Sequence, residues 1–221
     1  MTYTIAVISA GLSQPSSTRL LADQLAEATR RAAGQRIDVV NIELRELAHD
    51  ITNNLLTGFP SKALQQAVDA VAAADGVIAV TPVFSASFSG LFKSFFDIID
   101  RDSLIGKPVL MAATGGSARH SLVLEYALRP LFAYLKATIV PTGVFAATDD
   151  FGSDEAGRSL ADRVHRAGAE LVALMGLMAT PSGRVVTEAE ISPGPAQPGR
   201  PAREPDPFES FVPFDELLAR R

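Results

Sequence analysis

The sequence contains no cysteine, which excludes disulfide bonds, thiolate metal sites, redox-active thiol pairs and attachment of a cofactor through cysteine sulfur. Any electron chemistry in this chain therefore depends on a bound cofactor. Histidine is also scarce, and the three histidines, His49, His120 and His165, lack the spacing of a metal-binding motif. A metal site built by the protein alone is not expected.

Long apolar runs and basic stripes are missing as well. No run approaches the roughly 18 apolar residues that a membrane span needs. The formal net charge is −5, and no basic stripe is interleaved with aromatic residues, so nucleic acid is not an expected partner. The stretch MTYTIAVIS runs directly into a strand pattern without the basic region and cleavage site of a secretory signal. We therefore expect a cytoplasmic protein that does not bind membranes.

Five apolar segments of strand length recur along the chain, and several are apolar throughout, as in parallel strands covered on both faces. These segments are residues 3–9, 36–42, 76–82, 108–114 and 138–146. Helix-like segments alternate with them at residues 17–33, 62–74, 87–100, 119–136 and 154–178. This alternation predicts an α/β fold with a doubly wound five-stranded parallel sheet and helices on both faces. Right-handed crossovers leave few topologies, of which the flavodoxin-like order 2-1-3-4-5 is a common one.

The C-terminal part of the chain differs in composition. Its prolines forbid a regular helix or a central strand, and they are Pro193, Pro195, Pro198, Pro201, Pro205 and Pro207. We therefore divide the chain into a folded domain at residues 1–180 and an extended proline-rich tail at residues 181–221. The tail ends in FESFVPFDELLARR, whose apolar side chains either dock on a neighbour or belong to a disordered end.

In a sheet of this kind, ligands bind at the carboxyl ends of the first, third and fourth strands. The loop after the first predicted strand, SAGLSQPSSTR, is rich in hydroxyls and leads into a helix. Backbone N–H groups, hydroxyl donors and the helix dipole suit a terminal phosphate, whereas a bridging pyrophosphate needs more glycine than this loop has. We predict that the phosphate contacts are Ser9, Ser16, Ser17 and Thr18, with Arg19 as a further candidate. One of the two adjacent serines is also expected to cap the helix.

The loops after the third and fourth predicted strands suit a planar ring. In TPVFSASFSG, Pro82 lacks an N–H, and the backbone of the turn after it can lie along a flat ligand. In ATGGSARH, Gly115 and Gly116 let the backbone approach a ring, and Ser117 can donate a hydrogen bond. For His120 two positions stay open: near the pyrimidine edge of the ring or the nicotinamide, or in a helix cap or facing solvent. The phenylalanines of LFKSFFD are expected in the core or at an oligomer interface.

Three segments carry a family resemblance, and they are TPVFSASFSGLFKSFFD, LIGKPVLMAATGGSARHSLVLEYALRPLFAYLKA and GVFA. In them the chain resembles the NAD(P)H-dependent FMN reductases of flavodoxin-like fold, specifically those that supply reduced flavin to two-component monooxygenases, as in alkanesulfonate use. The likeness covers about residues 3–175 and is strongest over residues 76–150. It implies FMN, NAD(P)H as hydride donor, a homodimer or homotetramer, and a flavin-dependent monooxygenase that receives the reduced flavin.

The resemblance also assigns roles to residues. It places the FMN phosphate on the hydroxyl loop and the isoalloxazine between two groups, which are Pro82, Val83, Phe84 and Ser85 on one side and Thr114, Gly115, Gly116 and Ser117 on the other. Many relatives have tyrosine where this chain has Phe84. Tyr126 matches a tyrosine that lies in a π-bulge at the tetramer interface of the sulfonate-linked reductases. No catalytic side chain is assigned, because hydride transfer between stacked rings requires position and exclusion of water.

Two other functions stay open at this point. A quinone, azo or metal-ion reductase would retain its FMN and pass electrons to a bound acceptor. A non-enzymatic flavodoxin-like electron carrier would present an acidic docking face, and a net charge of −5 does not stand out as one. The choice between NADH and NADPH is not assigned, although Arg119 and Arg129 are candidate contacts.

Overall fold

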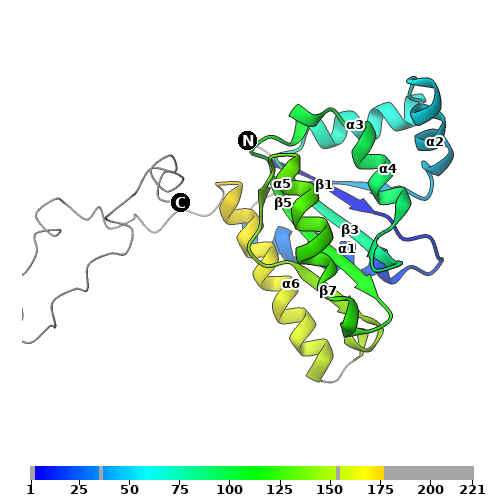
Figure 1. Cartoon of the computed structure of the whole chain (residues 1–221). Helices are drawn as coiled ribbons and strands as arrows, with labels where there is room; N and C mark the ends of the chain where they lie inside the picture. The colour runs from blue at the N-terminus through cyan, green and yellow to red at the C-terminus, as the bar shows by residue number, and fades with distance from the viewer. Residues whose placement is uncertain (1–2, 35–36, 153–154, 177–221) are drawn as a thin grey trace, which may run out of the picture. The chain divides into compact units, whose positions relative to one another are not determined.

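The sheet of this protein follows the order β2-β1-β3-β5-β6, and every neighbouring pair along this path is parallel. In the computed structural model, which describes residues 3–34, 37–152 and 155–176, these strands are β1 (Tyr3–Ser9), β2 (Ile37–Glu43), β3 (Gly76–Phe84), β5 (Pro108–Gly115) and β6 (Thr138–Ile139). Figure 1 labels the three central strands of this path, β1, β3 and β5. The predicted α/β class and flavodoxin-like arrangement are confirmed. The predicted tail at residues 181–221, with its apolar end, lies outside the described residues.

Within the described residues the sheet has seven strands, not the five predicted, and two short ones, β4 and β7, lie off the main path. Strand β4 (Ser87–Phe88) pairs antiparallel with the end of β3, so the helix predicted from residue 87 begins only after it. Strand β7 (Val144–Ala147) pairs in parallel with the end of β5. The single strand predicted at residues 138–146 is therefore two strands, β6 and β7.

Pro141 separates these two strands, because it has no N–H to donate to a neighbouring strand. The segment between the two strands is bound by a side chain of a helix. The Glu170 carboxylate accepts hydrogen bonds from the Thr142 N–H at 2.8 Å and from the Thr142 hydroxyl at 2.9 Å. At Thr142, hydrogen bonds to the Glu170 side chain thus take the place of hydrogen bonds between strands.

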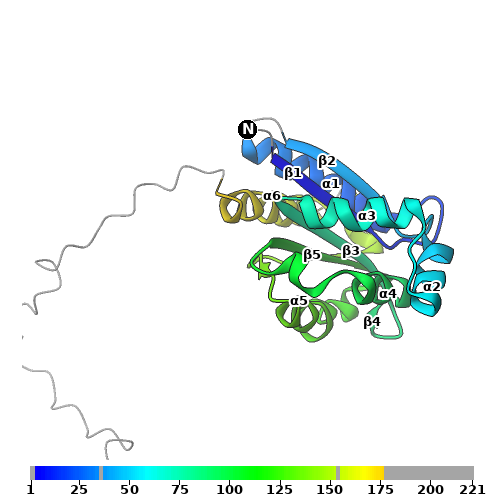
Figure 2. The same ribbon diagram turned by 90° about the horizontal axis from the view of Figure 1, so that it is seen from above.

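Helices cover both faces of the sheet (Figure 2). Helices α1 (Ser17–Ala33) and α6 (Glu155–Leu174) pack on one face, and α2 (Ala48–Thr57), α3 (Lys62–Ala73), α4 (Gly90–Ile98) and α5 (Arg129–Tyr134) pack on the other. Because side chains alternate along a strand, β1 supplies both cores: Ile5 and Val7 lie under α1 and α6, and Ala6 and Ile8 face the opposite layer. No helix in the described part of the chain has both the length and the apolarity needed to span a membrane.

The helix predicted at residues 119–136 consists of three pieces. A 3-10 turn (Ala118–His120) is followed by a π-helical turn (Leu124–Leu128) and then by α5. Pro130, near the start of α5, cannot donate the hydrogen bond that a regular helix would send to the carbonyl of Tyr126. A wider turn just before the proline accommodates this missing donor. The π-bulge predicted at Tyr126 is confirmed.

The amine of Lys107 stabilises the end of α3. It donates to the carbonyl oxygens of Val71, Ala72 and Ala74 at 2.9, 2.7 and 2.6 Å, which are acceptors that the helix leaves unpaired. Burial lowers the pKa of the Lys107 amine, and the nearby Asp75 carboxylate opposes this change. Burying an ammonium without hydrogen-bond partners costs free energy of folding. The three carbonyl acceptors offset this cost, so Lys107 stabilises the fold through them.

We expect Lys107→Met to lower the free energy of unfolding by about 2 kcal/mol, because hydrogen bonds that involve a charged group contribute about 1.5–3 kcal/mol each and the cost of burying the ammonium offsets part of their sum, while the alkyl stem is kept. Urea denaturation of both proteins measures the difference. Lys93→Met is the matched control, since the amine of Lys93 pairs with the exposed Asp97, one helical turn away. Equal stability of Lys107→Met and the parent protein would contradict this role.

Candidate functional site

The three predicted ligand loops begin at one edge of the sheet. Strands β1, β3 and β5 are neighbours and parallel, so their carboxyl ends lie together. Strand register places Ser9 beside Val80 and Pro82 beside Thr114. The fold therefore brings together three segments that are far apart in the sequence.

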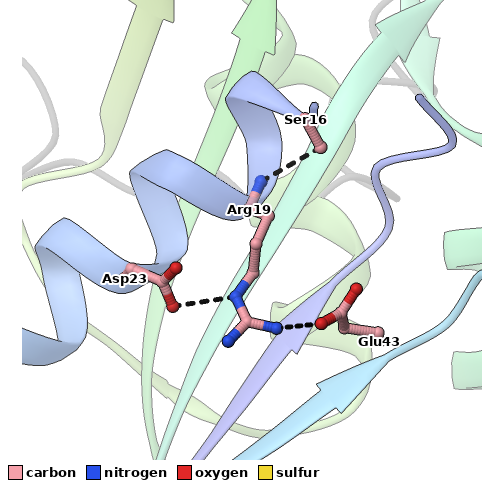
Figure 3. A network of polar contacts seen from close by, with 4 residues as sticks. All are labelled: Ser16, Arg19, Asp23 and Glu43. Carbon is pink, nitrogen blue, oxygen red and sulfur yellow. Dashed lines mark hydrogen bonds and ion pairs between the residues drawn. The ribbon is translucent and has the colours of Figure 1, made fainter. Parts of the chain in front are cut away.

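The first loop is shaped by contact between Gly11 and Ser16. Ser16 is the N-cap of α1, and its side-chain oxygen accepts a hydrogen bond from the Arg19 N–H at 3.2 Å (Figure 3). A Cβ on Gly11 would lie 2.0 Å from this oxygen, so any larger residue would force the Ser16 side chain to move. The cap predicted for one of two serines is therefore Ser16. Sequence analysis missed the role of Gly11, although a single glycine among hydroxyl residues was a signal for close approach.

A cavity of about 290 Å³ opens on this loop. Of the predicted phosphate residues, Ser9 and Ser16 line it, while Ser17 is exposed outside it and Thr18 is buried. Arg19 and Arg45 also line the cavity. Serine hydroxyls and guanidinium groups thus face the same space.

Thr18 joins the first loop to the third. Its hydroxyl oxygen lies 2.8 Å from that of Thr114 at the end of β5, and both side chains are buried. One of the two hydroxyl protons makes this bond, whichever residue donates it. Thr18 was predicted as a phosphate contact and Thr114 as a ring contact, and the structure places the two in direct contact with each other.

The second loop is a tight β-hairpin between β3 and β4. Val83 pairs with Phe88 and Phe84 pairs with Ser87, which leaves Ser85 and Ala86 as the turn. Both turn residues have positive φ, 48° and 65°, a conformation that usually requires glycine or asparagine. Such strain persists only where the surroundings hold it, and it is concentrated at ligand sites.

The base of this hairpin is held by Thr81. The buried hydroxyl of Thr81 donates to the Pro82 carbonyl at 2.9 Å and accepts from the Ser89 N–H at 3.0 Å. Ser89 in turn caps α4 by accepting from the Phe92 N–H. These hydrogen bonds hold the base of the hairpin in place, while Phe84 near its tip is 47% exposed.

We expect Ala86→Gly to raise the free energy of unfolding by about 1 kcal/mol, since glycine adopts positive φ without the penalty that alanine has there. Thermal and urea denaturation measure this gain. Ala118→Gly, in a 3-10 turn with ordinary φ, is the control and is expected to lower stability instead. A less stable Ala86→Gly protein would show that the turn is unstrained.

The third loop combines two glycines with different surroundings. A Cβ on Gly115 would lie 2.9 Å from Cζ of Phe145, so a larger residue would force the phenyl ring packed here to shift. A Cβ on Gly116 would meet no atom within 4 Å, so the backbone there borders open space. Ser117 follows in an extended conformation, and its side chain makes no cap. The predicted approach of a ring is compatible with Gly116 in particular.

A second cavity, of about 320 Å³, lies between the hairpin, the third loop and the π-helical turn. Ala86 and Ser87 contribute from the hairpin, His120 from the third loop, and Tyr126 from the π-helical turn. Arg119 lines this cavity too, while Arg129 does not. A larger cavity, of about 430 Å³, lies between α1 and α6 and has no wall from the three loops.

Arg129 is engaged elsewhere. Its guanidinium donates two hydrogen bonds to the Glu125 carboxylate, at 2.5 and 2.9 Å. These bonds lower the pKa of the Glu125 carboxyl and raise that of Arg129. Arg129 therefore forms an ion pair with Glu125 of the π-helical turn and does not line the second cavity.

The strand order defines a flavodoxin-like fold, and the first loop lacks the glycine-rich spacing of a dinucleotide-binding loop. The chain belongs to the NADPH-dependent FMN reductase family, whose model matches residues 3–152.

The chain is also similar in sequence and in fold to individual proteins. The chain is 39% identical over 173 residues to the NADH-dependent FMN reductase SfnE of Pseudomonas putida, which covers 78% of this chain and 92% of that protein. An oxidoreductase from Corynebacterium diphtheriae of known crystal structure is 50% identical, with a TM-score of 0.77 over 80% of this chain and 99% of the other. The apo crystal structure of the NADH:FMN oxidoreductase EMOB is 31% identical, with a TM-score of 0.67 over 82% of this chain and 94% of the other.

Proposed function

We propose that this chain is an NAD(P)H:FMN oxidoreductase whose flavin site is the meeting point of the three loops, within the domain at residues 1–180. The observation that carries the proposal is the convergence of these loops at the carboxyl ends of β1, β3 and β5. The contact between Thr18 and Thr114 fixes the first loop against the third. Family membership supports the chemistry, because the names of its relatives specify FMN and a nicotinamide nucleotide.

The residues of the first loop fit a phosphate. In this proposal, Ser9 and Ser16 offer hydroxyls on the cavity wall, and Ser17 and Thr18 offer backbone N–H groups in the first turn of α1. The cap from Ser16 satisfies the N–H of Arg19, so the two N–H groups before it are left for an anion. Thr18 thus contributes through its backbone, while its side chain holds Thr114.

The other two loops fit the isoalloxazine ring. Pro82, Val83, Phe84 and Ser85 form one proposed wall, and Thr114, Gly115, Gly116 and Ser117 form the other. When bound, FMN accepts a hydride from the nicotinamide at N5. The protein contributes a rigid hairpin, an exposed aromatic side chain at Phe84 and open space beside Gly116, which together position the ring and exclude water from one face. No acid or base is needed for this step.

We further propose that FMN is exchanged as a substrate and that reduced flavin leaves to serve a flavin-dependent monooxygenase in the cytoplasm. The phosphate cavity opens to the surface, which supports exchange. We also propose a homodimer or homotetramer. Exposed apolar side chains around the π-helical turn support it, since Leu122, Tyr126 and Tyr134 are 61%, 79% and 66% exposed.

Steady-state oxidation of NADH and of NADPH, each with FMN, FAD or riboflavin, tests the function. We expect rapid oxidation with FMN and slower oxidation with riboflavin, which lacks the phosphate. Spin filtration after turnover then separates flavin in solution from flavin on the protein. Most flavin is expected in the filtrate, whereas flavin retained on the protein would indicate a reductase that keeps its cofactor. Failure to oxidise either nucleotide would contradict the proposed activity.

A further inference from the structure

The cavity at the first loop contains an ion-pair network. Nε of Arg19 donates to the Asp23 carboxylate at 2.8 Å, and Nη1 of Arg19 donates to the Glu43 carboxylate (Figure 3). Glu43 ends β2 and lies in register beside Ser9. All three charged residues line the same cavity. Two carboxylates therefore hold the guanidinium at the place where the phosphate of FMN is proposed to bind.

This arrangement removes the positive charge that a phosphate site usually has. Arg19 alone would attract a dianion, but Asp23 and Glu43 together outweigh its single charge. The other cation on the wall, Arg45, has no ion pair within the described part of the chain. The four charges cancel, so the cavity offers hydrogen-bond donors to a phosphate without a net attractive charge.

We infer that Glu43 and Asp23 set the affinity of this loop for the phosphate of FMN, and that they keep it low. This inference rests on the proposed function. The two carboxylates repel a phosphate dianion and compete with it for the guanidinium of Arg19. Their effect is specific to the phosphate, because both line the cavity at the first loop, and no residue of the walls proposed for the ring lines that cavity. A flavin that is held weakly by its phosphate can leave after it is reduced.

Titration of the protein with FMN and with riboflavin, followed by flavin fluorescence, tests this role. We expect Glu43→Gln to bind FMN about tenfold more tightly than the parent protein, because one repulsive charge is lost and only Asp23 still forms an ion pair with Arg19. Riboflavin affinity is expected to stay the same. Asp23→Asn is expected to act in the same direction. After turnover and spin filtration, more FMN is expected to remain with Glu43→Gln than with the parent protein.

Glu27→Gln is the matched control. Glu27 lies on α1 one turn beyond Asp23, pairs with Arg31 at 2.8 Å, and does not line the cavity at the first loop. It changes the net charge by the same amount, and FMN affinity is expected to stay the same. Equal tightening in Glu27→Gln and Glu43→Gln would overturn the inference, since the effect would then come from net charge alone.

Two further outcomes would overturn the inference while leaving the proposed function in place. The first is FMN affinity in Glu43→Gln equal to that of the parent protein. The second is weaker FMN binding in Glu43→Gln, which would mean that Glu43 orients Arg19 toward the phosphate. If the parent protein and all variants bind neither FMN nor riboflavin, the proposed function itself is wrong.

Discussion

Gly116→Val is expected to reduce FMN affinity by at least about 100-fold while leaving the fold intact. A Cβ at this position meets no protein atom within 4 Å, so the added side chain projects into open space. In the proposed site this space belongs to the isoalloxazine ring. Fluorescence titration with FMN measures the loss, and circular dichroism with thermal unfolding checks the fold.

Gly90→Val is the control for this variant. Gly90 also has no atom within 4 Å of an added Cβ, but it begins α4 and lies outside the walls proposed for the ring. FMN is expected to bind this control as it binds the parent protein. An unchanged flavin titration in Gly116→Val would contradict the placement of the ring beside the third loop.

Gly11→Ala is expected to weaken FMN binding by at least about tenfold and to lower the free energy of unfolding by about 1–2 kcal/mol, the range for loss of a helix cap. The added Cβ would lie 2.0 Å from the side-chain oxygen of Ser16, so Ser16 must move and its bond to the Arg19 N–H is lost. FMN and riboflavin titrations measure the two affinities. Riboflavin is expected to lose less affinity, because it has no phosphate for this loop to bind.

Ser16→Ala tests whether the loss of stability in Gly11→Ala comes from the clash with the Ser16 hydroxyl. Without the Ser16 hydroxyl, the closest atom to the new Cβ is gone, so Gly11→Ala should cost less stability in Ser16→Ala than in the parent protein. Urea denaturation of the two single variants and the double variant gives this coupling. A cost that is the same in both backgrounds would contradict the contact between Gly11 and Ser16.

The regular part of the fold was predictable because its patterns are local. Strands β1, β3 and β5 are apolar runs buried between helices, and α1 has the predicted bounds of Ser17–Ala33. Helix α2 was missed because only Ile51 among its residues is buried, while Leu55 and Leu56 are exposed. Leu47, Ile51 and Leu55 do recur at helical spacing, but a ten-residue helix with one buried apolar residue gives a weaker signal than α1 does.

The candidate site was predictable only as far as each loop taken alone. Hydroxyls before a helix indicated a cap and a phosphate site, and Ser16 is that cap. The bond between Thr18 and Thr114 joins residues 96 positions apart, and the bond between Arg19 and Glu43 joins residues 24 apart. Neither follows from a local pattern, because strand order and register decide which side chains meet.

A crystal structure of this protein with FMN tests the central claim most directly. The account predicts one FMN per chain, with its phosphate at Ser9, Ser16 and the first turn of α1 and its ring between the Pro82–Ser85 segment and Gly116. Flavin density at another part of the surface, or crystals grown in saturating FMN without flavin at these loops, would contradict it.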